Sequence, residues 1–406
     1  MTLYTTLDQS DRAVEIGLEY LRRVGVDFSP HPTDADVQQE YGRLWRHLGD
    51  RAIGALVDLP ETRDPDCIAT LEVLTLTVPA ANFTDENLFC VAVARMASLS
   101  VEHGNNDASC HAYVWLGMIL RSRFDNFEAA FRFGRLGIDL VERQGLDRFK
   151  ARVYSDFGHL INPWTGHLRD GVDWVRRALF TAQTNGDLTF ASFAGNSLTM
   201  LLLASGEPLD DVQWEVENGL EFTRKVRFGL FADIMTGQLG LIRALRGLTS
   251  DLSSFGDEQF DERRFQRRLE KDPRLAFAAC WYWIRKLQAR FHANDYAGAV
   301  AAADRAQTLM WTSSPFFEAA EYHFYAALAR AAASDSSTGD AQRRSRDALS
   351  AHHRQLRTWA QHCPENFADR AALVGAEIAR LEGRDVDTMR LYDQAIRLAR
   401  DNGFVQ

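Results

Sequence analysis

One helical pattern recurs along the chain at nearly constant spacing, and this spacing constrains the fold more than any other feature. Each copy has a short polar turn followed by a helix with small or apolar residues at fixed places. The copies centre on Ala129, Gly171, Val212, Phe255, Ala299, Arg343 and Thr388, at intervals of 41 to 45 residues. A two-helix hairpin cannot bury its apolar face alone, whereas stacked hairpins share one core. The spacing therefore predicts an all-α chain of stacked helical hairpins.

Apolar periodicity and helix-ending residues agree with that prediction. In the segment 171–187, Val172, Val175 and Leu179 fall on one helical face, and the segment closes with Asn-Gly-Asp. Glycine commonly ends helices because it tolerates a left-handed backbone. The best strand candidate is LEVLTLTVPA at 71–80, although its leucine spacing also suits a helix that stops before Pro79.

Weaker copies of the pattern extend the repeats towards the N-terminus. They lie near Ala13, Ala52 and Glu86. The expected number of hairpins is then nine or ten. We predict a single continuous repeat domain over residues 1–406, with irregular repeats in 1–85 and more regular repeats in 86–406. The low-complexity stretch at 333–347 is expected to be a mobile loop between helices.

The copy around Ala129 matches the tetratricopeptide pattern of an aromatic residue, a Leu-Gly pair, a small residue and a second aromatic residue. These places hold Tyr113, Leu116, Gly117, Ala129 and Phe133. The copy around Ala299 has Trp283 at the first aromatic place but lacks the Leu-Gly pair. The repeats are therefore divergent, and we predict a tetratricopeptide-like α-solenoid wound into a right-handed superhelix.

The cluster Trp281-Tyr282-Trp283 could either pack the scaffold or contact a ligand. Trp283 falls on the face that packs between helices, whereas Trp281 points elsewhere. The concave-face places of two copies hold His111, Val114, Met118, Arg121, Trp281, Ile284, Gln288 and Phe291. From them we take as candidate binding residues His111, Met118, Arg121, Trp281, Gln288 and Phe291. Either they line a groove, with Trp281 and Arg121 partly exposed, or neighbouring hairpins bury them.

Composition narrows the function classes. The net charge of −10 argues against a nucleic-acid-binding body, which would be basic. The five cysteines are scattered, without the pairs of a zinc knuckle or a disulfide framework. The sequence shows no secretory signal and no apolar run of the roughly 20 residues that a membrane helix needs. We therefore expect a cytoplasmic protein with no membrane or nucleic-acid partner.

Motifs for catalysis and cofactor binding are absent from the sequence. It contains no phosphate-binding loop, dinucleotide fingerprint, HExxH or GxSxG. Three other groups of residues invite a chemical interpretation: Asp210, Asp211 and Glu215; His352, His353, His362 and Cys363; and Cys110 with His111. Helix capping, polar helix faces and a buried thiol explain them better than a metal site or a nucleophile. We expect no enzyme, no cofactor and no ATP binding by the isolated chain.

Four long segments resemble the helical-repeat region of very large bacterial signalling proteins. They are residues 71–120, 241–262, 280–291 and 359–396. In that family a Ser/Thr-kinase-like domain and an AAA/STAND-type ATPase precede the repeats, and a GAF domain and a histidine kinase usually follow. The resemblance implies an excised fragment or a shortened member, since the kinase, ATPase and output domains are missing. It assigns no functional residue.

The favoured function is a regulatory or sensor scaffold. By resemblance, it would bind a protein, a peptide or a small ligand and control the linked ATPase or kinase. A free-standing peptide receptor is the first alternative, because a curved helical array presents a large concave surface. An all-α enzyme is the second, and it would need convergent ionisable groups in one cavity.

Overall fold

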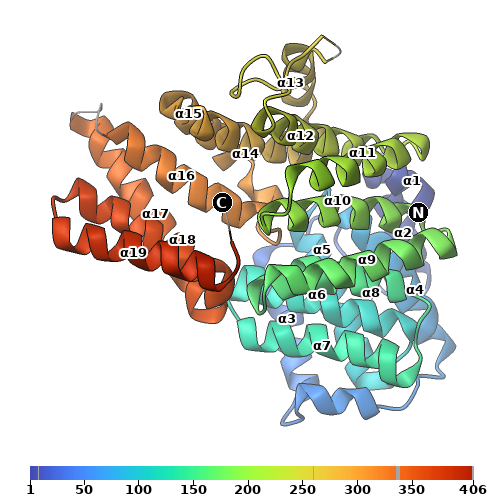
Figure 1. Cartoon of the computed structure of the whole chain (residues 1–406). Helices are drawn as coiled ribbons and strands as arrows, with labels where there is room; N and C mark the ends of the chain where they lie inside the picture. The colour runs from blue at the N-terminus through green and yellow to red at the C-terminus, as the bar shows by residue number, and fades with distance from the viewer. Residues whose placement is uncertain (8, 259, 335–338, 405–406) are drawn as a thin grey trace. The chain divides into compact units, whose positions relative to one another are not determined.

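The chain is all-α in the computed structural model, which describes residues 1–7, 9–258, 260–334 and 339–404 (Figure 1). These residues form nineteen α-helices. The only feature of strand type among them is an isolated parallel bridge between Glu61 and Asn105. In this part of the chain no helix combines the length and the apolar character needed to cross a membrane. The all-α class predicted from the repeat spacing is confirmed.

Two compact units make up the chain. The first comprises residues 1–161, 173–194 and 223–229, and the second comprises 162–172, 195–222 and 230–406. Four described helices contribute residues to both units: α9 Leu168–Asn185, α10 Leu188–Ala204, α11 Leu209–Lys225 and, by its first residue, α12 Gly229–Leu245. The single continuous domain over 1–406 and the right-handed superhelix stay predictions.

The first unit joins irregular N-terminal helices to regular hairpins. Its helices are α1 Thr2–Thr6, α2 Ser10–Arg23, α3 Asp34–Leu48, a 3-10 helix Ile53–Asp58, α4 Pro65–Ala81, α5 Glu86–His103, α6 Asp107–Phe124, α7 Phe127–Gln144 and α8 Lys150–Asp156, which continues as a π-helical turn Phe157–Ile161. Helix α3 packs on α5, and α2 packs on α4. These pairs are not consecutive in the chain, which explains why the repeat pattern is weak before residue 86.

The α6/α7 hairpin shows the physical basis of the tetratricopeptide pattern. A Cβ atom on Gly117 would lie 2.5 Å from the carbonyl oxygen of Ala130, so only glycine allows this close crossing. Tyr113 stacks on Phe133 across the hairpin, with ring centroids 5.8 Å apart. The side chain of Asn106 caps α6 by accepting a hydrogen bond from the Ser109 amide. The residues chosen from sequence therefore do the packing that the pattern predicts.

The strand candidate at 71–80 is helical. It lies inside α4, which begins at Pro65 behind a cap by Asp64 and runs through Pro79 to Ala81. Both faces of this helix are largely buried, so its sequence lacks the one-sided periodicity of a surface helix. Pro79 stands inside the last turn, where its missing amide removes one helical hydrogen bond, and the helix ends two residues later at Ala81.

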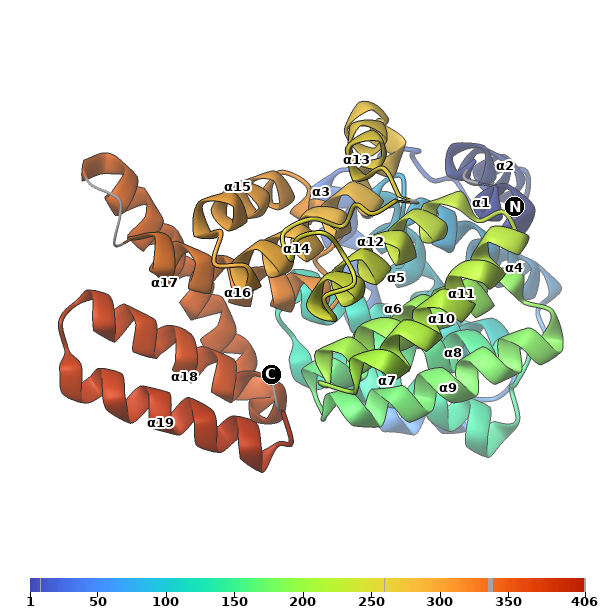
Figure 2. The same cartoon turned by 45° about the horizontal axis from the view of Figure 1, so that its top comes forward.

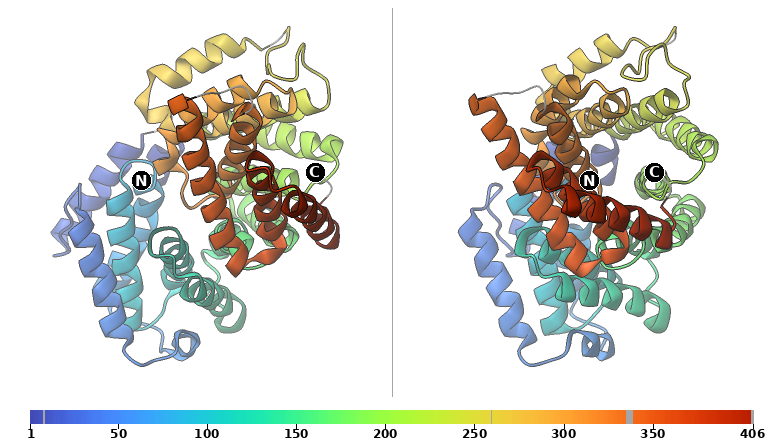
Figure 3. Two further views of the ribbon diagram at one scale, coloured as in Figure 1. Left: turned by 90° about the vertical axis from the view of Figure 1, so that its left-hand side faces the viewer. Right: turned by 60° about the vertical axis from the view of Figure 1, so that its left-hand side comes forward.

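The second unit contains the most regular hairpins. Its remaining helices are a 3-10 turn Asn162–Trp164, α12 Gly229–Leu245, α13 Glu262–Lys271, a 3-10 turn Pro273–Leu275, α14 Ala276–His292, α15 Tyr296–Gln307, a 3-10 turn Met310–Thr312, α16 Glu318–Ser334, α17 Gly339–His362, α18 Pro364–Leu381 and α19 Asp385–Asp401. Helices α18 and α19 run side by side as a long hairpin (Figure 2). The helices α14, α16 and α18, each the first helix of its hairpin, also pack against one another in sequence order (Figure 3).

The loop predicted at 333–347 is shorter than expected. Residues 335–338 lie outside the described residues, but the backbone from Gly339 onward is already the start of α17. An ion pair between Arg343 and Asp340, three positions apart, supports this first turn. The low complexity of residues 339–347 reflects the polar first turns of α17.

Trp281 and Trp283 are both packing residues of the α14/α15 hairpin. Trp283 is buried, and the guanidinium of Arg305 lies over its ring at 4.4 Å. Trp281 is only 3% exposed, and its indole nitrogen donates a hydrogen bond to Ser313 Oγ at 3.0 Å. Of the two alternatives for Trp281, the structure shows burial, because the turn before α16 covers it.

A segment far away in sequence completes the core of the second unit. Trp164 is fully buried, and it stacks on Phe367 and meets Trp359 edge to face. The side chain of Asn366 accepts a hydrogen bond from the Leu168 amide and donates to the carbonyl of Pro163. These contacts fix residues 162–168 on the hairpins α16/α17 and α18/α19.

Candidate functional site

A cavity of about 640 Å³ lies within the second unit. Side chains of α12, α14, α16 and α18, the end of α10 and one face of α19 form its walls. Most of the lining is apolar, including Leu203, Leu241, Phe291, Phe324, Leu328 and Leu373. Ligand sites in proteins commonly occupy about 300 to 1,000 Å³ and combine such apolar walls with a few polar groups.

The first helices present the same register to this cavity. Each has a polar residue followed three positions later by an apolar residue of the wall. The pairs are Gln238 and Leu241 on α12, Gln288 and Phe291 on α14, Glu321 and Phe324 on α16, and Arg370 and Leu373 on α18. Of the polar members, Gln288, Glu321 and Arg370 line the cavity, whereas Gln238 does not. Residues three apart share one helix face, so the repeat places a polar row beside an apolar row.

Hydrogen bonds link the polar row between helices. Glu321 accepts from Gln288 Nε2 at 2.6 Å and from Arg370 Nη1 at 2.6 Å. Arg285, one turn before Gln288, donates to Gln288 Oε1 at 2.9 Å and to Glu318 at 2.9 Å. All of these side chains are buried. Three successive first helices are thus held in register by charge-assisted bonds.

Burial changes the acidity of the carboxyl groups in this network. It raises the pKa of Glu318 to about 7, although the guanidinium of Arg285 opposes the rise. Burial also raises the pKa of Asp369, which lies beside Arg370 and lines the cavity. The Oδ1 atom of Asp369 is shielded from solvent and has no hydrogen-bond partner among the described residues. Asp369 is therefore a wall carboxyl that the protein does not fully satisfy.

Two amides outside the cavity lining are also unsatisfied. Gln238 on α12 is buried, and neither atom of its amide group has a hydrogen-bond partner in the described part of the chain. Asn196 on α10 is buried as well, and its Oδ1 atom lacks a partner there. Neither residue lines the cavity, so these amides belong to the packed interior.

The last described residues close one side of the cavity. Phe404 lines the wall and stacks on His167, with ring centroids 5.3 Å apart. Arg169 Nη2 donates to the carbonyl oxygens of Gly403 at 2.9 Å and of Ser205 at 3.0 Å. The end of α19 is thereby tied to the turn after α10.

Two of the six candidate binding residues line the cavity. They are Gln288 and Phe291 on α14. Trp281 lies on the same helix but belongs to the packed core, as does Ile284 from the wider set. Whether any of the six residues binds a ligand stays a prediction.

The other three candidates are interior residues of the first unit. His111 is fully buried and pairs with Asp156 at 2.6 Å. Met118 and the neighbouring Val114 are buried. Arg121 is only 4% exposed, and burial lowers its pKa to about 9. For Arg121 as well, the structure shows burial and not partial exposure, because helix packing covers the face of α6 that carries it.

The residue groups that invited a chemical interpretation are part of the scaffold. His352 faces His323, with their Nδ1 atoms 3.0 Å apart, and His353 bonds the carbonyl of Ala371. Cys110 is buried, and burial raises the pKa of its thiol well above the ordinary range. In the described part of the chain no three His, Cys, Asp or Glu side chains are grouped to hold a metal ion.

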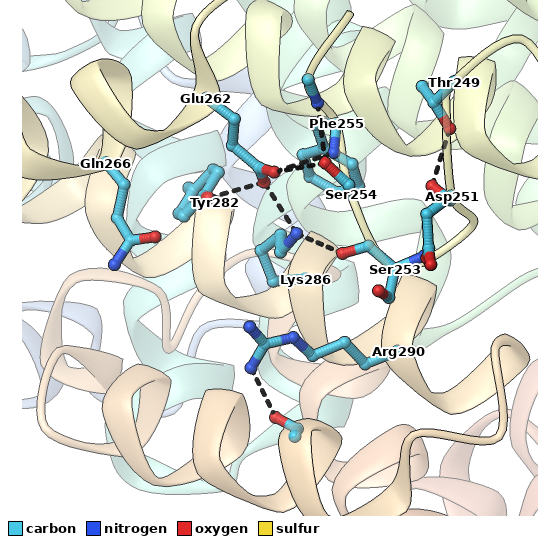
Figure 4. Close-up of polar contacts among 12 residues, drawn as sticks. Thr249, Asp251, Ser253, Ser254, Phe255, Glu262, Gln266, Tyr282, Lys286 and Arg290 are labelled. Carbon is cyan, nitrogen blue, oxygen red and sulfur yellow. Dashed lines mark hydrogen bonds and ion pairs between the residues drawn. The ribbon is translucent and has the colours of Figure 1, made fainter.

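A second polar cluster fastens the connection between α12 and α13 (Figure 4). Glu262 accepts hydrogen bonds from Tyr282, Ser254 and the Phe255 amide and forms an ion pair with Lys286 at 2.7 Å. Lys286 also donates to the carbonyl of Ser253, and its ammonium lies 4.5 Å from the centre of the Phe255 ring. Because the lysine is buried and engaged on several sides, the cluster serves as a structural tie to α14.

Sequence reasoning missed Glu321, Asp369 and Arg370. The signal was available, because the places that hold Gln288 and Phe291 on α14 recur as Glu321 and Phe324 on α16 and as Arg370 and Leu373 on α18. Only the copies around Ala129 and Ala299 were used to locate a concave face. No repeated residue pattern in the sequence indicates that α19 and Phe404 line the cavity. Their position depends on contacts with residues distant in sequence, such as His167 and Arg169.

Comparison with known proteins identifies a fold and no family. No family model matches the sequence, and no curated protein matches it. Among solved structures, the chain is similar to a Rap protein complexed with competence and sporulation factor. The TM-score is 0.54 at 12% identity, over 91% of this chain and 97% of that chain. The tetratricopeptide-like fold of paired helices predicted from sequence is therefore confirmed, as a Rap-like arrangement.

Proposed function

We propose that the chain is a peptide receptor and that the cavity of the second unit is its binding site. The observation that carries this proposal is the repeated register of polar and apolar residues on α12, α14, α16 and α18. An extended peptide has the matching pattern, since it presents backbone donors and acceptors beside its side chains. The similar Rap structure, with its bound factor, is a precedent for ligand binding by this fold.

The polar groups of the wall support a peptide more than a wholly apolar ligand. Burying a polar group without a hydrogen bond costs about 1 to 3 kcal/mol. The wall contains Gln288, Glu321 and Arg370, and the shielded Oδ1 atom of Asp369 has no hydrogen-bond partner among the described residues. A peptide backbone inserted along the first helices would supply both donors and acceptors, whereas a hydrocarbon ligand would supply neither.

A pool of random hexapeptides tests the proposal. The intact chain is incubated with the pool, and retained peptides are identified by mass spectrometry. Ala399→Trp places a large ring in the cavity, because Ala399 lines its wall. Arg397→Trp adds the same ring to an exposed position of the same helix and serves as the matched control. We expect Ala399→Trp to abolish retention and Arg397→Trp to preserve it. Equal retention by both variants would contradict the assignment to this cavity.

A sensor arm within a larger signalling protein is the second candidate. The four segments that resemble the repeat region of kinase- and ATPase-bearing proteins favour it. No comparison supports the kinase or ATPase modules themselves. The coding context decides this point, since such modules would lie in the same reading frame. That the isolated chain is not an enzyme also stays a prediction.

A further inference from the structure

We infer that the peptide carries a positively charged nitrogen and that Asp369 binds it. This inference rests on the proposed function and adds the chemical class of the ligand. The nitrogen is either the ammonium of the peptide's N-terminus or the side chain of a lysine or arginine. Apolar side chains of the same peptide lie against Phe291, Phe324 and Leu373.

The first support is the inventory of charges along the first helices. These helices carry two guanidinium groups, Arg285 and Arg370, and three carboxyl groups, Glu318, Glu321 and Asp369. Arg285 pairs with Glu318, and Arg370 pairs with Glu321. Asp369 is half-buried and forms no ion pair among the described residues, although the nearby charge of Arg370 favours its ionised form. Removing a carboxylate from water is costly unless a cation balances it, so one further positive charge would complete the set.

The second support is the surroundings of the Asp369 side chain. Its Oδ1 atom has no partner among the described residues. Among the described residues, the titratable groups that share its cavity wall are Arg370 on α18, Glu321 and Tyr325 on α16, His292 on α14, Tyr392 on α19 and Glu207 after α10. Glu207 already pairs with Arg169 at 3.2 Å. Tyr325 is engaged with His292, and Tyr392 with Glu377. Burial lowers the pKa of His292, so at neutral pH this histidine supplies no cation.

An anionic peptide fits the cavity less well. Among the described residues, Arg370 is the only basic side chain of the cavity wall with a permanent charge, and it already donates to Glu321 at 2.6 Å. The guanidinium of Arg370 also lies over the rings of Phe317 and Phe324, at 5.3 and 5.1 Å. An acidic ligand would have to break this pair and leave Glu321 unpaired in an apolar wall. A cation leaves the existing pairs intact.

Four matched hexapeptide pools test the charge preference and its source. Three pools are N-acetylated and carry lysine, glutamine or glutamate at one fixed position. The fourth pool carries glutamine at that position and has a free N-terminus. We expect at least one of the two cationic pools to be retained about tenfold better than the acetylated glutamine pool. The acetylated lysine pool reports a side-chain cation, and the free-amine pool reports an N-terminal ammonium.

Variants assign the preference to Asp369. Asp369→Asn keeps the shape of the side chain and removes its charge, so the tenfold preference should disappear while glutamine peptides are still retained. Asp393→Asn alters an exposed carboxyl on α19 and should keep the preference. A preference that survives Asp369→Asn, or better retention of glutamate peptides, would overturn the inference. If peptides are retained without charge preference, only this inference fails. If no pool is retained, the proposed function fails with it.

Discussion

At the scale of single residues, burial decides which aromatic side chains serve the fold. Trp281 contacts Phe277 and Phe316, and its indole nitrogen donates a hydrogen bond to Ser313. Trp214 on α11, in contrast, is 64% exposed. Both are tryptophans on helices of the second unit. Sequence alone cannot separate them, because the turn that covers Trp281 comes from thirty residues further along the chain.

Replacing Trp281 should therefore destabilise the protein. We expect Trp281→Ala to lower the free energy of unfolding by about 3 to 5 kcal/mol, since it leaves a large cavity and removes the hydrogen bond to Ser313. Trp214→Ala should change it by no more than about 0.5 kcal/mol. Urea denaturation followed by circular dichroism measures both. Similar midpoints for the two variants would show that Trp281 is not a core residue.

Glu318 should give stability a specific pH dependence. Its pKa rises on folding from an ordinary 4.5 to about 7, with burial as the main cause. Between these pH values the folded protein holds a proton that the unfolded chain releases, so the contribution of Glu318 to stability falls as pH rises. Glu318→Gln removes this titration. The free energy of unfolding of the variant, relative to wild type, should increase from about pH 5 to 7. A difference from wild type that stays constant over this pH range would refute the pKa shift. Asp393→Asn, which alters an exposed carboxyl, is the control for which a constant difference is expected.

At the scale of helices, the hairpins could be predicted from sequence where small residues mark a close crossing. Gly117 and Ala129 identify α6/α7, and Ala299, Ala303 and Ala306 identify α14/α15, where all three are buried. For residues 71–80 the sequence left strand and helix both open, because a helix buried on both faces loses its one-sided periodicity. The contribution of α19 to the cavity wall could not be predicted, because this wall forms only when segments distant in sequence meet.

Two glycine substitutions test the close crossing. Gly117→Ala should destabilise the protein, because the added Cβ would lie 2.5 Å from the backbone oxygen of Ala130, which cannot move aside. Gly42→Ala, within α3, meets only a flexible arginine tip at 3.4 Å and should stabilise by about 0.5 to 1 kcal/mol. Thermal denaturation reads out both. A rise in melting temperature for Gly117→Ala would mean that α6 and α7 do not approach as described.

At the scale of the whole molecule, fold and function separate clearly. The chain shares its Rap-like arrangement with a protein of 12% identity, so stacking of hairpins tolerates nearly complete change of sequence. Such a likeness shows the architecture and leaves the ligand open. What distinguishes this chain is the set of side chains that its first helices place in the cavity, and of these Gln288 and Phe291 were found from sequence. Glu321, Asp369 and Arg370 became visible only when successive helices could be compared in one register.

A photocrosslinking map tests most directly the central claim that the cavity of the second unit binds a peptide. A hexapeptide retained from the random pool is synthesised with benzoylphenylalanine, irradiated with the intact chain, and its attachment points are located by mass spectrometry. The account predicts crosslinks on the first helices α12, α14, α16 and α18, near Leu241, Phe291, Phe324 and Leu373. Crosslinks confined to the second helices α15 and α17, or to the first unit, would contradict it.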